Sequence, residues 1–194
     1  MFLNTYTLII ITVLYSCSVD GLRWKDCASN PLNASLTFDS FQIWPFPVVI
    51  PGNVHFSADV TVNKQIHKLY IDEDVDELIS KYIFTLPCAV DGLGSCGDID
   101  ACEYQNQNLP VVWEKFMYYM LGNDSTCPVP TKSVVIQDEM LTIANLPIEL
   151  ANFASRMFEI RLHFKDDKNS KGHIGCLELD FEFTLSDSIL SALG

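Results

Sequence analysis

The sequence is poor in basic residues, with 12 Lys and Arg against 25 Asp and Glu in 194 residues, and its formal net charge at pH 7 is −13. Nucleic-acid binding needs clusters of Lys and Arg for the phosphates, so this composition argues against a nucleic-acid partner. The charge either serves solubility alone or keeps the chain away from anionic membranes at neutral pH. In the second case the repulsion weakens at acidic pH, where carboxylates begin to protonate.

The sequence also lacks the motifs of common catalytic and metal sites. It contains no GxSxG, no HExxH and no carboxylate set for two metal ions, so it does not point to an enzyme. No CxxC pair and no closely spaced pair of histidines occurs, which argues against zinc. The acidic stretch 72–77, interpreted as a solvated loop, lacks the glycine and the spacing of a calcium-binding loop. We therefore expect no metal and no cofactor.

Long apolar runs are missing except at the start of the chain, where residues 8–15 are apolar and residues 16–18 are small. This pattern predicts a signal peptide over residues 1–18, followed by one domain over residues 19–194. Residues 14–17 also resemble a bacterial lipidation box weakly. We expect a secreted or lysosomal protein, and the sequons at Asn33 and Asn123 predict N-glycosylation in that compartment.

Six cysteines remain after residue 18, and an even number in a secreted chain predicts disulfides. Six cysteines allow fifteen pairings, and their spacing alone does not choose among them. They are Cys27, Cys88, Cys96, Cys102, Cys127 and Cys176.

Residues 157–185 have the clearest periodicity in the chain. Apolar and polar residues alternate from Phe158 to Lys165, a polar turn follows over residues 166–172, and the alternation resumes from Leu177 to Leu185. Period-two alternation places each set on one face of a strand, so the pattern predicts an antiparallel hairpin with one apolar face. Another sheet, a helix or a ligand must cover that face.

The remaining elements predict an all-β sandwich or cup with one helix. Residues 54–62 alternate as a second amphipathic strand, and shorter strands are expected near residues 35–38, 69–71 and 82–86. Residues 133–136 and 140–143 predict one or two more strands. The helix is expected over residues 110–122, with one wide apolar stripe that either packs on the sheet or forms a flexible lid over a ligand. The proline-rich segment 43–52 either packs along the edge of the sheets or exposes Trp44 and Phe46 to a membrane or partner.

The proline-rich motif Pro45-x-Pro47-Val48-Val49-Ile50-Pro51-Gly52 and the surroundings of the cysteines resemble the ganglioside activator protein family. The matching surroundings include Trp24-Lys25-Asp26-Cys27, Leu86-Pro87-Cys88, Cys127-Pro128 and Ile174-Gly175-Cys176. Members of this family are lysosomal sphingolipid activators and cofactors of β-hexosaminidase A, related to the MD-2-type lipid-recognition proteins. The resemblance implies an antiparallel β-cup with a large apolar pocket and the disulfides Cys27–Cys176, Cys88–Cys96 and Cys102–Cys127. The family's fourth disulfide is absent, and the expected helix occupies its interval.

The resemblance and the alternation together predict a non-enzymatic protein that extracts a glycolipid or phospholipid from a membrane. It would present the lipid to a hydrolase, with a glycosidase as a candidate partner, or to an acceptor membrane. An extracellular carrier of a small apolar ligand or sterol is the alternative, and a lipid-free interaction module or an enzyme is a third possibility. The residues expected to line the pocket are Phe56, Val60, Phe158, Ile160, Phe164, Phe181 and Phe183. Those expected to touch the membrane transiently are Trp44, Phe46, Ile148, Leu150 and Phe153.

Overall fold

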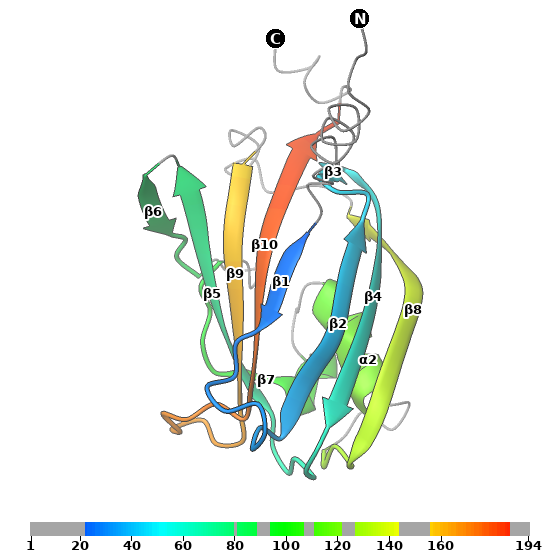
Figure 1. Cartoon of the computed structure of the whole chain (residues 1–194), viewed down its shortest axis with the longest axis vertical. Coiled ribbons are helices and arrows are strands. Elements are labelled where there is room, and N and C mark those ends of the chain that lie inside the picture. The colour runs from blue at the N-terminus through cyan, green and yellow to red at the C-terminus, as the bar shows by residue number, and fades with distance from the viewer. Residues whose placement is uncertain are drawn as a thin grey trace, which may run out of the picture.

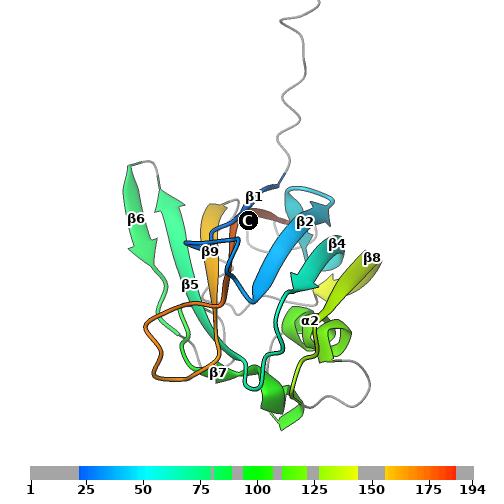
Figure 2. The ribbon, with the colours of Figure 1, turned by 60° about the horizontal axis from the view of Figure 1, so that its bottom comes forward.

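A computed structural model describes residues 22–79, 81–88, 94–106, 111–121, 127–143 and 156–186. Within these residues the chain forms two β-sheets that face each other, with one α-helix beside the smaller sheet (Figure 1, Figure 2). The larger sheet runs β1-β10-β9-β5-β6, with β3 paired to β10 and β7 paired to β5, and the smaller sheet runs β2-β4-β8. The strands of the larger sheet are β1 (Arg23–Asp26), β3 (Val48–Ile50), β5 (Tyr70–Ile79), β6 (Tyr82–Thr85), β7 (Ile99–Asp100), β9 (Arg156–Lys165) and β10 (Gly175–Leu185). Those of the smaller sheet are β2 (Leu36–Trp44), β4 (Gly52–Val62) and β8 (Lys132–Ile143).

The predicted hairpin is the centre of the larger sheet. Strands β9 and β10 pair antiparallel, with Phe158 opposite Phe181 and Leu162 opposite Leu177. Leu162, Phe164 and Leu177 are buried on the face toward the smaller sheet. The alternation of the sequence thus becomes the two faces of the sheet, as predicted.

The prediction of a solvated loop over residues 72–77 is wrong, because this stretch lies inside the ten-residue strand β5. Ile71 and Val75 are buried on its inner face, and the aspartates between them point to the outer face. Cations of β9 balance Asp72 and the next aspartate after Val75, Asp76: Lys165 lies 2.7 Å from Asp72, and Arg161 lies 2.5 Å from Asp76. These cross-strand ion pairs offset the repulsion between the aspartates, so that three of them can occupy one strand.

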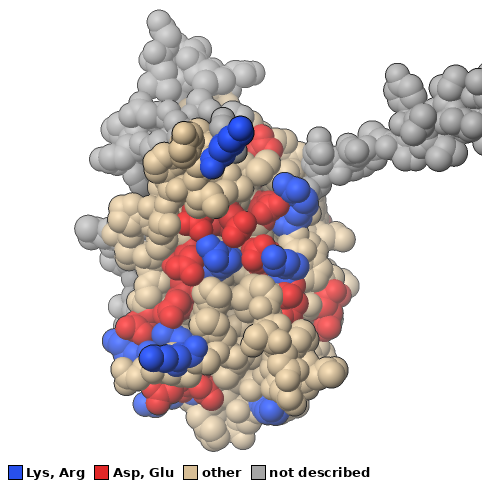
Figure 3. Space-filling view, turned by 60° about the vertical axis from the view of Figure 1, so that its left-hand side comes forward, with Lys and Arg blue, Asp and Glu red and all other residues tan. Residues whose placement is uncertain are grey.

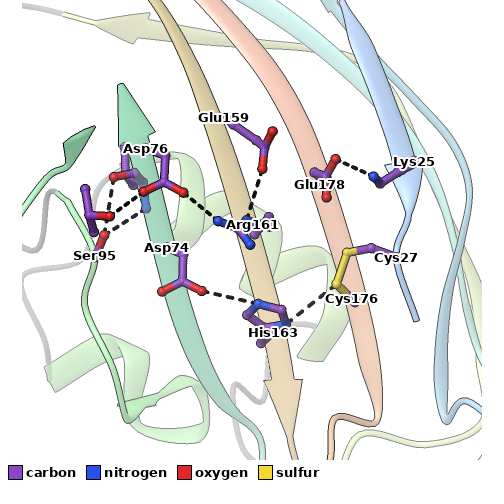
Figure 4. Close-up of polar contacts among 12 residues, drawn as sticks. Lys25, Cys27, Asp74, Asp76, Ser95, Glu159, Arg161, His163, Cys176 and Glu178 are labelled. Carbon is purple, nitrogen blue, oxygen red and sulfur yellow. Dashed lines mark hydrogen bonds and ion pairs between the residues drawn. A yellow bond between two sulfur atoms is a disulfide. The ribbon is translucent and has the colours of Figure 1, made fainter. Parts of the chain in front are cut away.

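The outer face of the larger sheet carries further ion pairs of the same kind. Figure 3 shows acidic and basic side chains interleaved on this side of the molecule. Figure 4 shows the contacts, in which His163 of β9 lies 3.3 Å from Asp74 and Lys25 of β1 lies 2.6 Å from Glu178 of β10. The charged residues of the hairpin therefore lie on the outer face of the sheet, and its inner face is mainly apolar.

The proline-rich segment combines both features that the sequence suggested. Strand β3 pairs in parallel with β10, with Val48 opposite Phe183, and Val48 and Ile50 are buried. Trp44, at the end of β2, is 36% exposed. Part of the segment thus packs along the sheet edge, while the tryptophan stays partly accessible. The β3–β10 pair is also a parallel element in a fold predicted as antiparallel.

Three disulfides connect the elements in the pairing that the resemblance implied. Cys27–Cys176 joins the end of β1 to β10 across 149 positions, and Cys88–Cys96 closes a short loop beside β5. Cys102–Cys127 brackets the helix α2 (Val111–Leu121). Two of the three bridges therefore tie the connecting segments back to the larger sheet.

The helix α2 packs on the protein through one apolar face, as one of the two interpretations of its sequence predicted. Met117 and Met120 have no exposed surface, and Phe116 is 5% exposed. Tyr119, partly buried against the core, donates a 2.6 Å hydrogen bond to Glu139 of β8. A short 3₁₀ helix (Ala101–Asn106) precedes α2. Within the described ranges, no helix has the length and apolar character needed to cross a membrane.

Candidate functional site

The two sheets enclose a cavity of about 240 Å³ between their inner faces. Its surface is almost wholly apolar, and it receives side chains from both sheets and from α2. The lining residues are Phe38, Phe41, Ile43, Val54, Phe56, Glu73, Phe116, Leu141, Ile143, Ile160, Leu162, Phe164, Leu177, Leu179 and Phe181.

The strand register shows how the cavity is oriented. Neighbouring residues of paired strands point to the same face, so inward residues form rows across β5, β9 and β10. One row contains Glu73, Leu162 and Leu177, and other rows along the strands include Ile160 and Phe181. Phe181 pairs with Phe158, which lies six residues before Phe164 on β9. The rows of Phe164 and Phe181 are therefore about 20 Å apart along the strand. The cavity therefore extends along the strands.

Aromatic rings close one end of the cavity. The ring centroids of Phe38 and Phe164 lie 5.6 Å apart, and Phe116 of α2 lies within 6.5 Å of both. Such offset aromatic contacts stabilise a close-packed cluster. Phe164 has no exposed surface, so this cluster forms a closed floor.

Partial exposure marks the opposite end. Ile43, Ile143, Ile160 and Phe181 line the cavity, yet each keeps some accessible surface. Ile43 precedes Trp44 at the end of β2, and Ile143 is the last residue of β8. The mouth of the cavity is therefore at the end of the two sheets where the proline-rich segment lies.

One ionisable side chain among the described residues lines this apolar cavity. Glu73 points inward from β5, in the row of Leu162 and Leu177. Burial in apolar surroundings disfavours its charged form and raises the pKa of this carboxyl to about 7. Its Oε2 atom is buried and has no hydrogen-bond partner among the described residues.

Sequence reasoning missed Glu73 because it read the acidic stretch as a loop. A usable signal was present: Ile71, Glu73 and Val75 occupy alternate positions, and the aspartates occupy those between them. Ile71 and Val75 are four positions apart and so share one face of a strand, and the glutamate midway between them falls on the same inner face.

The structure places the seven predicted pocket residues in two groups. Phe56, Ile160, Phe164 and Phe181 line the cavity. Val60, Phe158 and Phe183 are buried in the core outside the lining, and Phe158 stacks on Phe183 with centroids 5.4 Å apart. Their role in lipid binding remains a prediction. The lining residues that were not predicted, such as Phe38, Leu162 and Leu179, follow the same alternation on neighbouring strands.

The predicted membrane-contact residues are described only in part. Trp44 stacks on His55 with centroids 5.6 Å apart, and His55 lies 2.6 Å from Asp138. Phe46 is half-buried in the turn between β2 and β3. Ile148, Leu150 and Phe153 lie outside the described residues. Membrane contact remains a prediction for all five.

The other predicted sites fall on the surface or outside the described ranges. Asn33 lies exposed in a turn before β2, where a glycan has room, and Asn123 and residues 1–18 are outside the described residues. No group of three metal-ligating side chains gathers anywhere in the part of the chain that the structure describes.

Comparison with protein families gives a match to the ML domain, the MD-2-related lipid-recognition domain, over residues 21–183. The chain belongs to this family. The match supports the wider ML family and does not single out the ganglioside activators. ML domains are lipid-binding domains without enzymatic activity, and the ML fold supports lipid binding in general for this chain.

Two solved structures are similar to this ML domain at low sequence identity. No curated protein sequence matches it. A Niemann-Pick type C2 protein from the Japanese carpenter ant is 11% identical, with a TM-score of 0.43, over 84% of this chain and 99% of that chain. Chicken MD-1 complexed with lipid IVa is 15% identical, with a TM-score of 0.39, over 84% of this chain and 91% of that chain.

Proposed function

We propose that this ML domain is a non-enzymatic lipid-binding and lipid-transfer protein. The observation that carries the proposal is the apolar cavity of about 240 Å³ between two sheets, of which the larger carries its ion pairs on its outer face. An enclosed apolar space replaces the bilayer for a hydrocarbon chain, and each buried methylene contributes about 0.8 kcal/mol relative to water.

The arrangement of the mouth supports exchange with a membrane. Ile43 lines the cavity, and the next residue, Trp44, is 36% exposed beside it. A tryptophan at this place suits the boundary between acyl chains and headgroups, because its ring is apolar and its N–H is polar. We therefore propose that Trp44 and Phe46 approach the membrane while a lipid enters or leaves.

The headgroup of a bound lipid would stay at the mouth, where a hydrolase or an acceptor membrane can reach it. A glycolipid or phospholipid presented to a glycosidase is the specific form of this proposal, in a secreted or lysosomal setting with Asn33 and Asn123 glycosylated. The formal charge of −13 supports activity at acidic pH, where repulsion from anionic membranes falls.

An extracellular carrier of a small apolar ligand or sterol is the second candidate, and the cavity volume favours it. An engineered protein cavity of about 150 Å³ binds benzene, and pockets for drug-sized molecules range over about 300–1,000 Å³. At about 240 Å³ the unfilled cavity suits one chain or one compact molecule more readily than two long chains.

The test is native mass spectrometry of the protein from its own source, with identification of the co-purifying lipids, alongside a variant with a filled cavity. Ile160→Trp adds volume inside the cavity, while Val135→Trp adds the same group at a position 57% exposed on β8. We expect bound lipid in the wild type and in Val135→Trp, and at least a tenfold loss in Ile160→Trp. Equal lipid content in all three proteins contradicts the proposal, and the identity of the lipid separates the two candidates.

A further inference from the structure

The buried carboxyl of Glu73 is an unusual group for the wall of an apolar cavity. Its Oε2 atom is shielded from solvent, and no described residue bonds to it. The backbone holds the residue in place, since its N–H donates a 2.7 Å hydrogen bond to the carbonyl of Cys96, whose disulfide anchors that loop. A polar atom that is buried without a partner destabilises the fold.

The described charged groups nearest to Glu73 along the chain and in the adjoining loop form ion pairs on the outer side of β5. On β5, Asp72 and Asp74 point outward, toward Lys165 and His163 of β9. In the loop beside β5, Asp98 also lies 3.4 Å from Lys165. These groups and Glu73 border a polar hollow on the outer side of β5, with Ser95, Cys96 and Gly97.

On the cavity side, no described residue of the cavity lining brings a cation to Glu73. The facing strands contribute Leu162 and Leu177, and α2 contributes Phe116. Glu77, the other inward carboxyl of β5, is 4% exposed and lies outside the cavity lining. The carboxyl of Glu73 therefore has a free bonding position that a molecule inside the cavity can reach.

We propose that Glu73 recognises a hydroxyl group on an otherwise apolar ligand, which enters the cavity with the hydroxyl innermost. The inference rests on the proposed lipid-binding function and names the class of ligand, an aliphatic alcohol or a sterol. A hydroxyl donates one hydrogen bond and accepts others, so it suits a carboxyl in a cavity that offers few other polar partners. An alkane of the same shape leaves the carboxyl unpaired.

Protonation of Glu73 then controls binding. With its pKa at about 7, the side chain is neutral in acidic solution and both donates and accepts a hydrogen bond. Above pH 7 the side chain is charged, and a ligand in the cavity would remove the carboxylate from water. This desolvation costs free energy and opposes binding. If only the protein with neutral Glu73 binds the ligand, about one protein molecule in eleven can bind at pH 8, whereas nearly all can at pH 5. The apparent affinity therefore falls about tenfold between pH 5 and pH 8.

The experiment measures displacement of the fluorescent probe N-phenyl-1-naphthylamine at pH 5 and pH 8. The competitors are dodecanol against dodecane and cholesterol against cholestane, so that each pair differs by one hydroxyl. The proteins are the wild type, Glu73→Gln and Glu73→Leu, with Asp74→Asn as the matched control on the outer face of the same strand.

In the wild type and in Asp74→Asn we expect tighter binding of the alcohols at pH 5, by about tenfold over pH 8. Glu73→Gln should bind equally at both pH values. In Glu73→Leu the affinity ratio of alcohol to hydrocarbon should fall by about fivefold, the equivalent of one neutral hydrogen bond. Whichever hydroxylated competitor shows the larger ratio, dodecanol or cholesterol, identifies the source of the hydroxyl.

Two results overturn the inference, and they are distinguishable. If the wild type binds the fluorescent probe and all competitors without a hydroxyl preference or pH dependence, Glu73 does not recognise a hydroxyl and the lipid-binding function stands. If the wild type binds neither probe nor competitor at either pH, the proposed function fails as well. Unfolding curves of each variant, measured alongside, show whether lost binding comes from lost structure.

Discussion

Replacing Glu73 with glutamine removes an ionisable group from the cavity wall at nearly constant volume, and the pH dependence of stability should change as a result. In the folded protein the pKa of this carboxyl is about 7, against an ordinary value of 4.5. Between these two values the unfolded chain has released its proton and the folded protein retains it. Because the unfolded state binds fewer protons there, the free energy of unfolding falls as pH rises.

The size of the effect follows from the difference in pKa. One unit corresponds to about 1.36 kcal/mol, so a shift from 4.5 to about 7 destabilises the wild type by about 3 kcal/mol at pH 8 relative to pH 4. The glutamine variant lacks this loss. The free energy of unfolding of the variant minus that of the wild type should therefore increase by about 3 kcal/mol between pH 4 and pH 8, with most of the change between pH 4.5 and 7.

Urea denaturation with intact disulfides, followed by tryptophan fluorescence at several pH values, gives this difference directly. The other carboxylates are present in both proteins, so their contributions to the pH dependence cancel in this difference. Glu182→Gln, which removes a carboxylate from an outward position of β10, separates the effect of burial from that of net charge. A difference that stays constant within about 0.5 kcal/mol from pH 4 to pH 8 would refute the buried, unpaired state of Glu73.

Three further expectations concern the disulfides, the cavity floor and the mouth. Replacing Cys27 and Cys176 together with alanine should lower the free energy of unfolding by about 5 kcal/mol, because the bridge closes a loop of 149 positions; a loss below about 2 kcal/mol contradicts this. Phe164→Ala should lower stability by about 3–5 kcal/mol in the same assay, since its side chain has no exposed surface, and an unchanged midpoint speaks against a packed floor. Trp44→Ala with Phe46→Ala should reduce vesicle co-sedimentation, more visibly at pH 4.5 than at pH 7, while leaving the unfolding midpoint within a few degrees; equal binding by the variant and the wild type argues against membrane contact.

Much of the fold could be predicted from local pattern. The alternation around Phe158 and Leu177 predicted a hairpin with one apolar face, because side chains of a strand alternate between faces whatever covers them. The disulfides could not be chosen from spacing. They came from the resemblance, since chain segments as distant as Cys27 and Cys176 meet only through the complete fold.

The candidate site could be predicted less well, for a physical reason. Periodicity tells which face of a strand is buried, and it does not tell whether the facing side chains touch each other or leave space. Phe158 and Ile160 have the same inward direction on β9, yet Phe158 is packed against Phe183 and Ile160 borders the cavity. That difference depends on the separation of two sheets, which no single strand encodes. Glu73 was missed because high charge density concealed the strand pattern around it.

The attachment of α2 has a mechanical consequence for the cavity. The walls formed by the two sheets are held by continuous backbone hydrogen bonds between strands, whereas α2 is held to β8 by side-chain contacts such as that of Tyr119 with Glu139. The buried side chains described on α2 are Phe116, Met117 and Met120, and the unbranched methionines readily adopt other rotamers. The disulfide Cys102–Cys127 also joins the chain before α2 to the chain after it. The two sheets thus form rigid walls of the cavity, and α2 forms a wall that can move. A bulky ligand should therefore displace α2 while the strand pairing stays intact.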